Sequence, residues 1–260
     1  MGTFMPLKHY FGKELALRLA GLIQPVYPDF DSDQFVRAVE RQVEPLELKA
    51  RVRVIADELH RAIPLDYPDQ IAVLLGILGP ENENERGMFT EGYFLMPVAD
   101  FVERYGLDHF RISMDALYEI TKRHTSEYAI RPYLRRYPEV CMEMLEVWSR
   151  DANFHVRRLV SEGTRPRLPW AKRMDALMGD PLRNLALLEP LRDDASAYVR
   201  RSVANHLNDL TRDHRQVTLC WIAEKLNAGW AHGPGVVRRA LRTLVKRKDP
   251  DALAIIRNLP

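Results

Sequence analysis

Cysteine and long hydrophobic runs are both scarce in this chain. Only Cys141 and Cys220 occur among 260 residues. Both lie in apolar helical patterns, so we expect two buried free thiols in a reducing cytoplasm rather than a disulfide. The longest apolar run, residues 71–78, is far shorter than the about 20 residues that cross a bilayer. The N-terminus lacks the order of charged and apolar residues that marks a secretory signal. These absences predict a cytoplasmic protein without a membrane segment.

Several motifs that hold ligands or perform catalysis are also missing. The chain has no H-E-x-x-H sequence, and its two cysteines cannot form a structural zinc site alone. It contains no P-loop, no G-x-S-x-G and no G-x-G-x-x-G after a strand. The Gly-Pro-Gly sequence at 233–235 is better explained as a turn between repeats. Nothing in these patterns indicates a metal or an organic cofactor.

Strand patterns are absent as well, and helical spacing takes their place. Apolar residues recur with a helical period nearly everywhere, and proline or glycine interrupts them about every 12 to 20 residues. The helices predicted in the second half pair as 126–137 with 138–149, 153–162 with 169–178, and 196–207 with 214–226. We therefore expect an all-α fold in a single domain, 1–260, in which 1–110 is less regular and 111–260 forms regular repeats.

The tripeptide Val-Arg-Arg marks these repeats. It begins at Val156, Val199 and Val237, with separations of 43 and 38 residues. A period near 40 with two helices per unit is typical of HEAT-type solenoids. Stacking would align the arginines into a basic stripe on the concave face, where DNA is the first candidate partner. Adjacent helical residues diverge by about 100°, so one arginine of each pair should face the groove while the other pairs with acids or caps.

The net charge of +2 conceals an uneven distribution of charge along the chain. Residues 151–260 hold 20 lysines and arginines against 12 acidic residues, a balance of +8, whereas residues 1–150 have a balance of −6. A strong asymmetry of this kind is an argument about partners. We expect the phosphate backbone of DNA to bind the second half.

One carboxylate in the second half stands at an unfavourable place. The predicted helix 153–162 ends at Glu162, where the negative end of the helix dipole favours a cation instead. A functional role would explain this position. The alternative is an ordinary ion pair with Arg158, one helical turn earlier.

The segment that follows Glu162 combines basic and aromatic residues. Arg165 and Arg167 lie on a proline-rich loop that leads to Trp170, which we expect at the start of a helix. Guanidinium groups bind phosphate oxygens, and an aromatic ring packs on a sugar or base. The alternative is that Trp170 is buried between repeats and that the arginines are solvated.

A second carboxylate, Glu127, lies near the start of the predicted helix 126–137. Acidic residues are favoured in a first helical turn, which is a sufficient structural explanation. It lies 35 residues before Glu162, about one HEAT period. That spacing makes a position beside Glu162 plausible.

Two strings resemble a known family closely. They are S-E-G-T-R-P-R-L-P-W at 161–170 and V-R-R-S-V-A-N-H-L-N-D at 199–209, supported by S-E-Y-A-I-R-P-Y-L at 126–134. The chain resembles the bacterial HEAT-like-repeat alkylpurine DNA glycosylases, in particular their AlkC branch, over nearly its whole length. Some members carry an additional immunoglobulin-like domain, and the sequence resembles the short form without it.

The resemblance implies a specific activity and specific site residues. It implies hydrolysis of the N-glycosidic bond of N3-methyladenine in alkylated duplex DNA by a monofunctional glycosylase that does not flip the base. Glu162 and Glu127 match the family's carboxylates at the lesion, and Trp170 matches its aromatic residue at the deoxyribose. It implies no metal or cofactor. The DNA-backbone contacts that we expect are Arg158, Arg165, Arg167, Arg201 and Arg239.

The residues themselves are compatible with this chemistry. N3-methyladenine is cationic and a good leaving group, so a carboxylate that stabilises the developing positive charge on the sugar is sufficient. One alternative is a DNA-structure-binding HEAT protein without catalysis, and another is a protein-binding scaffold. A carboxylate close to phosphates favours the enzyme, which we expect to act as a monomer.

Overall fold

A computed structural model describes residues 6–85 and 91–259. Within these ranges the secondary structure is helical without any strand, as the sequence predicts. The contacts between residues divide the chain into two compact units, Met1–Ile130 and Arg131–Pro260. That 1–260 is a single domain, less regular over 1–110 and regular over 111–260, stays a prediction.

The first unit contains six α-helices and two short 3₁₀ helices in its described part. They are η1 (Leu7–Tyr10), α1 (Lys13–Ile23), α2 (Ser32–Val43), α3 (Leu48–Ala62), α4 (Tyr67–Gly76), η2 (Glu91–Leu95), α5 (Met96–Tyr105) and α6 (Phe110–Thr121). Helix α2 contacts α1 and α3, α3 contacts α5, and α6 contacts α4 and α5. Asp31 begins α2 by accepting a hydrogen bond from the Gln34 backbone, the usual role of an N-cap carboxylate.

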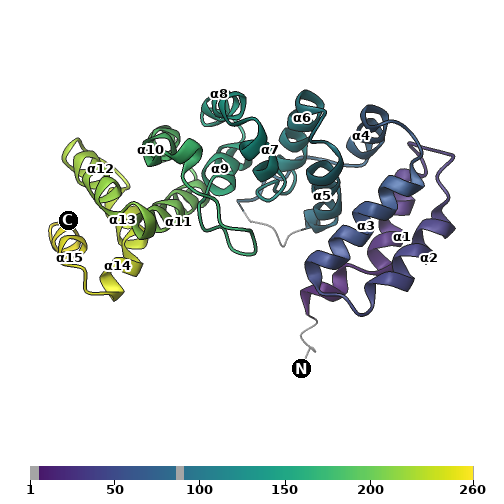
Figure 1. The fold of residues 1–260 in the computed structure, drawn as a ribbon, viewed down its shortest axis with the longest axis horizontal. Helices are drawn as coiled ribbons and strands as arrows, with labels where there is room; N and C mark the ends of the chain where they lie inside the picture. The colour runs from purple at the N-terminus through teal and green to yellow at the C-terminus, as the bar shows by residue number, and fades with distance from the viewer. Residues whose placement is uncertain (1–5, 86–90, 260) are drawn as a thin grey trace. The chain divides into compact units, whose positions relative to one another are not determined.

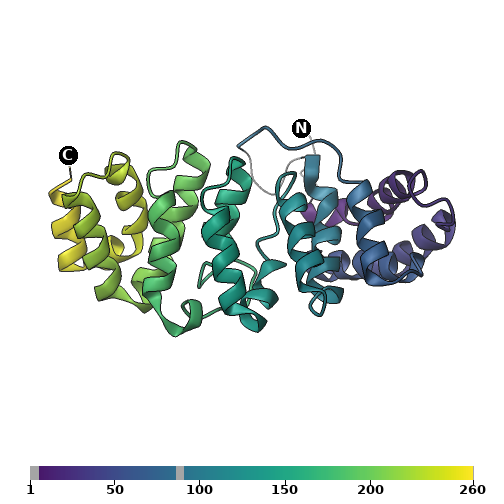
Figure 2. The same ribbon diagram turned by 90° about the horizontal axis from the view of Figure 1, so that it is seen from above.

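The second unit is a stack of helices in two layers. Its elements are α7 (Ile130–Arg136), α8 (Pro138–Trp148), α9 (Phe154–Gly163), η3 (Leu177–Gly179), α10 (Pro181–Leu188), η4 (Glu189–Leu191), α11 (Ala197–Asp213), α12 (Arg215–Asn227), α13 (Gly233–Ala240), α14 (Arg242–Lys246) and α15 (Pro250–Arg257). Helices α9, α11 and α13 follow one another in one layer, and α8, α10 and α12 form the other (Figures 1 and 2). This arrangement is the HEAT-like-repeat fold that the period predicts.

Helices α9 and α11 of the second unit begin at polar caps. Asn153 accepts a hydrogen bond from the His155 backbone at the start of α9, and Ser196 accepts from the Tyr198 backbone at the start of α11. The three Val-Arg-Arg sequences lie in the first turns of α9, α11 and α13, the helices of one layer. The valines Val156, Val199 and Val237 are fully buried and fill the core between the layers.

Arg157 connects two successive repeats. Its Nη1 donates to the backbone carbonyls of Asp151 and Ala152, before its own helix. Its Nε and Nη2 donate to the two carboxylate oxygens of Asp194, before α11, at 2.6 and 2.9 Å. The first arginine of this Val-Arg-Arg is thus structural.

Three expectations from the sequence are wrong, one of them the turn at 233–235, which is instead the first turn of α13. Residues 169–178 do not form a helix but a loop that ends in η3, and α10 begins only at Pro181. The loop is held by contacts from another helix, which a local pattern does not reveal. Of the two free thiols, Cys141 is buried, but Cys220 is exposed on α12. Burial raises the pKa of the Cys141 thiol to about 12.

Replacing Arg157 with alanine should lower the free energy of unfolding by about 3 kcal/mol, because Asp194 would remain buried without its cation. The Asp194 side chain is only 4% exposed. Arg37→Ala is the matched control, since its pair with Asp33 is exposed and 4.0 Å long, and such pairs contribute about 0.5 kcal/mol or less. Urea denaturation measures both variants. Equal losses would contradict the structural role of Arg157.

Candidate active site and nucleic-acid interface

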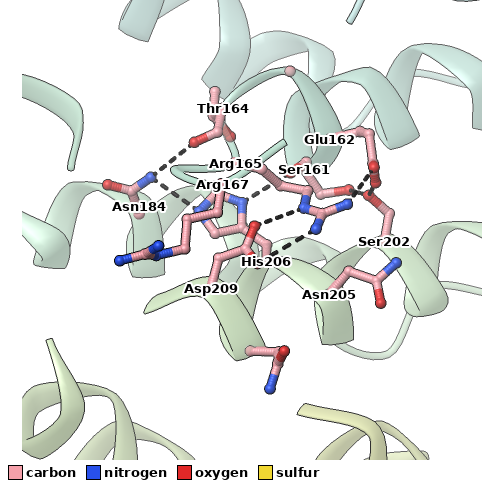
Figure 3. Close-up of polar contacts among 12 residues, drawn as sticks. Ser161, Glu162, Thr164, Arg165, Arg167, Asn184, Ser202, Asn205, His206 and Asp209 are labelled. Atoms are coloured by element: carbon pink, nitrogen blue, oxygen red, sulfur yellow. Dashed lines mark hydrogen bonds and ion pairs between the residues drawn. The ribbon is translucent and has the colours of Figure 1, made fainter. Parts of the chain in front are cut away.

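Glu162 lies in the last turn of α9 with its carboxylate buried. The Arg165 Nη1 donates to Oε1 at 2.6 Å, and the Ser202 hydroxyl donates to Oε2 at 2.5 Å (Figure 3). The Arg158 Nη2 lies 3.6 Å from Oε1. The ion pair with Arg158, which the sequence offered as the alternative explanation of Glu162, is therefore only one of its three contacts. Both carboxylate oxygens are fixed by partners from two helices and a loop.

The charge of Glu162 follows from these partners. Burial alone would raise the pKa of its carboxyl group, but Arg158, Arg165 and the Ser202 hydroxyl together hold that pKa below its ordinary value. The group is consequently ionised at neutral pH. The cations also offset the unfavourable helix dipole at this position.

Arg165 is turned into the protein. Besides its bond to Glu162, its Nε donates to Asp209 Oδ2 at 2.9 Å, and its Nη2 lies 3.4 Å from Oδ1. Arg165 is 6% exposed and Asp209 4% exposed. Burial raises the pKa of Asp209 and Arg165 counteracts it. The predicted contact of Arg165 with DNA remains a prediction, but in this structure its guanidinium binds two carboxylates.

The neighbouring arginines differ in their surroundings. Arg158 lies 5.1 Å from the centre of the Tyr198 ring in addition to its contact with Glu162. Arg167 binds both oxygens of Asp213 at 2.9 and 2.6 Å and is partly exposed. Their predicted roles as backbone contacts stay predictions.

The second arginines of the later repeats are exposed. Arg201 lies on the surface of α11, and Arg239 donates from Nε to Asn205 at 3.2 Å. Arg200 instead donates to the backbone carbonyl of Ala195, as Arg157 does to the equivalent carbonyls one repeat earlier. The expectation that the two arginines of a pair take different directions is confirmed for the copy at 199 and stays a prediction for the copy at 237. Arg200, Arg201, Arg239 and His232 line a cavity of about 370 Å³ between α11 and α13.

Beneath Glu162 lies a buried polar network around His206. Its Nδ1 lies 2.8 Å from the Ser161 carbonyl oxygen, and its Nε2 lies 3.0 Å from Asn184 Nδ2 (Figure 3). Since the carbonyl must accept and the amide must donate, the imidazole is neutral with its proton on Nδ1. Burial lowers the pKa of His206 to about 4. The network fixes the end of α9 to α11.

Arg131 fastens the loop that follows α9. It donates from Nη1 to the carbonyls of Gly163 and Arg165 at 3.0 and 2.8 Å, and from Nη2 to the carbonyl of Lys172 at 2.9 Å. These bonds hold the two ends of the segment that carries Trp170. These bonds attach the loop to α7.

Trp170 is exposed on this loop. Its side chain is 57% exposed and its φ is +62°, in the left-handed region that a bulky residue rarely adopts. It lies in a turn, not at the start of a helix as expected. The alternative in which Trp170 is buried between repeats is therefore wrong. Its predicted contact with the deoxyribose is untested and stays a prediction.

Glu127 belongs to the first unit. It is 3% exposed and lies in a turn before α7. The Thr125 hydroxyl donates to its Oε2 at 3.0 Å, and the Ser126 hydroxyl donates to the Leu117 carbonyl in the same turn. Its role at the lesion stays a prediction.

Sequence reasoning missed the residues that hold the predicted ones in place. Ser202 and Asp209 lie inside the string 199–209, but their spacing from Glu162 has no known motif. Arg131 occupies a helix whose neighbours Tyr133 and Leu134 are buried. A charged residue within an apolar helical face was the one available signal.

The described residues contain no group of three or more His, Cys, Asp or Glu side chains that could hold a metal ion. No helix in 6–85 or 91–259 is long and apolar enough to cross a bilayer.

The comparisons with known proteins point to one group. No protein-family model matches the chain. The uncharacterized protein YhaZ of Bacillus subtilis (strain 168) is 38% identical over 250 residues, which cover 96% of this chain and 67% of that protein. Among solved structures, the Pseudomonas fluorescens alkylpurine DNA glycosylase AlkC, bound to DNA containing an abasic site analog, matches with a TM-score of 0.87 and 35% identity. That match covers 98% of this chain and 69% of the other.

Acidification should destabilise the protein through His206. Its folded pKa lies below the ordinary value of 6.5, so the unfolded chain takes up the proton first. Stability is therefore lost as the pH falls from about 6.5 toward 4, by up to about 1.4 kcal/mol per pH unit from this group. His206→Gln, which can form the same two bonds, should remove that share of the slope. Urea denaturation at several pH values measures it.

His9→Gln, at an exposed histidine, is the control and should leave the slope unchanged. A His206→Gln slope equal to that of the wild type would show that the imidazole is not held neutral.

Proposed function

Because this chain belongs to the AlkC branch of the HEAT-like-repeat alkylpurine DNA glycosylases, we propose that it excises alkylated purines from duplex DNA. The substrate we propose is N3-methyladenine. Water attacks C1′ of the deoxyribose, the bond from C1′ to N9 breaks, and its electron pair leaves with the base. The products are neutral 3-methyladenine, an abasic site and a proton. The enzyme is monofunctional, acts as a monomer without base flipping, and uses no metal or organic cofactor.

The observation that carries this proposal is the buried, ionised carboxylate of Glu162. Departure of the base leaves positive charge on the sugar ring, and a fixed negative charge beside it lowers the barrier. Both oxygens of Glu162 are already bound, so little reorganisation accompanies the reaction. A strong general acid is unnecessary, because the methylated base is cationic before it leaves.

Trp170 supports a binding role for the loop after α9. A bulky residue at positive φ costs of order 1 kcal/mol or more, and the exposed indole leaves apolar surface in water. Neither feature helps the chain to fold. A contact with the deoxyribose at the lesion would explain both the positive φ and the exposed indole.

The second unit supplies the charge for binding DNA. Arg201 and Arg239 are exposed beside the cavity between α11 and α13, where guanidinium groups can bind phosphate oxygens. Arg158 and Arg167 are partly covered and contact their acidic partners. We assign Arg165 to the support of Glu162 in the first place and keep its phosphate contact as the weaker proposal.

The main alternative is a DNA-structure-binding protein without catalysis on the same scaffold. Buried Glu162 favours the enzyme, because a carboxylate near phosphates weakens binding. Incubation with duplex DNA that contains N3-methyladenine decides between them. The enzyme releases free base, whereas the pure binder only retains the duplex. A protein-binding scaffold would do neither.

Glu162→Gln should slow the release of N3-methyladenine by roughly 10²-fold or more, the scale for losing one well-placed electrostatic group. Binding of the duplex should be retained, since the amide is isosteric and removes a charge that repels phosphates. The single-turnover rate on a defined duplex measures this.

Glu146→Gln on the exposed face of α8 is the matched control and should match the wild type. A Glu162→Gln rate within about threefold of the wild type means that the carboxylate assignment is wrong.

Trp170→Ala should weaken both binding and turnover, because stacking on a base or sugar contributes about 1 to 3 kcal/mol. Val147→Ala is a suitable comparison, since Val147 is 70% exposed on α8, another helix of the second unit. Fluorescence anisotropy with a labelled duplex gives the affinity. Unchanged affinity in Trp170→Ala would show that the indole does not contact the DNA.

A further inference from the structure

Asp209 contacts the predicted catalytic carboxylate only through Arg165. The guanidinium of Arg165 lies between the two acids and uses different edges for each, Nη1 for Glu162 and the pair Nε and Nη2 for Asp209 (Figure 3). The two acids are on different helices, α9 and α11, and all three side chains are buried. Because Asp209 occupies the far edge of the guanidinium, Nη1 remains directed at Glu162.

The charges of this cluster balance only when Asp209 is included. Glu162 is paired with two cations, Arg158 at 3.6 Å and Arg165 at 2.6 Å. Without Asp209 these three groups would carry a net charge of +1 in a buried position. With Asp209 the four groups are neutral. The charges of Arg165 and Asp209 also oppose each other at Arg242: burial lowers the pKa of Arg242, Arg165 lowers it further and Asp209 raises it.

A net positive cluster would oppose the chemistry assigned to this site. The proposed substrate is cationic, and the sugar becomes cationic as the base leaves. Electrostatic interactions are strong in buried surroundings, where little water screens them. A carboxylate with two cations and no counter-charge would present a repulsive field to both species.

We propose that Asp209 is a positioning residue that neutralises Arg165, so that the Glu162 carboxylate retains a net attraction for a cationic sugar. This inference rests on the proposed function, because it concerns the same site. It assigns to Asp209 a part in catalysis that reaches Glu162 through Arg165, in addition to the direct bond from Ser202 on the same helix. A purely structural bond between α9 and α11 would instead affect all ligands alike.

Two duplexes that differ only in the charge of the abasic site test the inference. One carries a pyrrolidine abasic analogue with a protonated ring nitrogen, and the other carries a neutral tetrahydrofuran analogue. The wild type should bind the cationic analogue more tightly. Asp209→Asn should reduce this preference by about tenfold, the scale for one added unit charge in a protein-like dielectric. Its affinity for the neutral analogue should stay within about threefold.

A second variant separates charge from folding. In Arg165→Gln/Asp209→Asn, Glu162 and Arg158 alone remain charged, so the cluster is neutral again. Its preference for the cationic analogue should return to within about threefold of the wild type. Asp194→Asn is the matched control, because Asp194 also binds an arginine through both oxygens. It should lose stability but keep the preference, and thermal denaturation confirms the fold of every variant.

The outcomes distinguish the two proposals. A wild type that binds the duplexes without preferring the cationic one overturns the role of Asp209 and leaves the glycosylase proposal to the base-release assay. Equal losses for both analogues in Asp209→Asn, or no recovery in the double variant, also overturn it. A wild type that binds neither duplex and releases no base overturns both proposals.

Discussion

The bond between Glu162 and Arg165 is the interaction on which the second unit's site depends. A carboxylate at the C-terminal end of a helix is disfavoured by the dipole and, once buried, by desolvation. It is stable there only because cations and a hydroxyl surround it. Those cations need their own counter-charge, which comes from α11. The site is therefore a consequence of stacking one repeat on the next, and neither helix could hold it alone.

Stacking also explains why the two arginines of the Val-Arg-Arg sequences at 156 and 199 have different roles. The valine is buried between the layers. In the copies at 156 and 199, the first arginine donates hydrogen bonds to the backbone carbonyls just before its own helix. Rotation of about 100° turns the second arginine away from those carbonyls. In the copy at 156 it meets Glu162, and at 199 it is exposed. One short motif thus serves the fold and the proposed interface together.

The sequence predicts the repeats well because their signals are local. Helical periodicity, caps such as Asn153 and the recurrence of Val-Arg-Arg all lie within a few residues of what they determine. The expected helix 169–178 fails for the opposite reason. Its shape comes from Arg131, which binds the Lys172 carbonyl from 41 residues away, and no local pattern encodes that bond. The exposure of Cys220 likewise depends on which face of α12 packs inward.

The candidate site divides in the same way. Glu162 could be singled out because its conflict with the helix dipole is visible in the sequence, and Arg165 follows it by three residues. Asp209 could not be singled out, because its bond to Arg165 spans 44 residues and exists only after α11 packs on α9. Trp170 lies between these cases. Its residue type indicates a contact, but its positive φ and exposure appear only in the fold. Arg131 binds the backbone at both ends of the loop. These bonds offset the unfavourable backbone conformation of Trp170 between them.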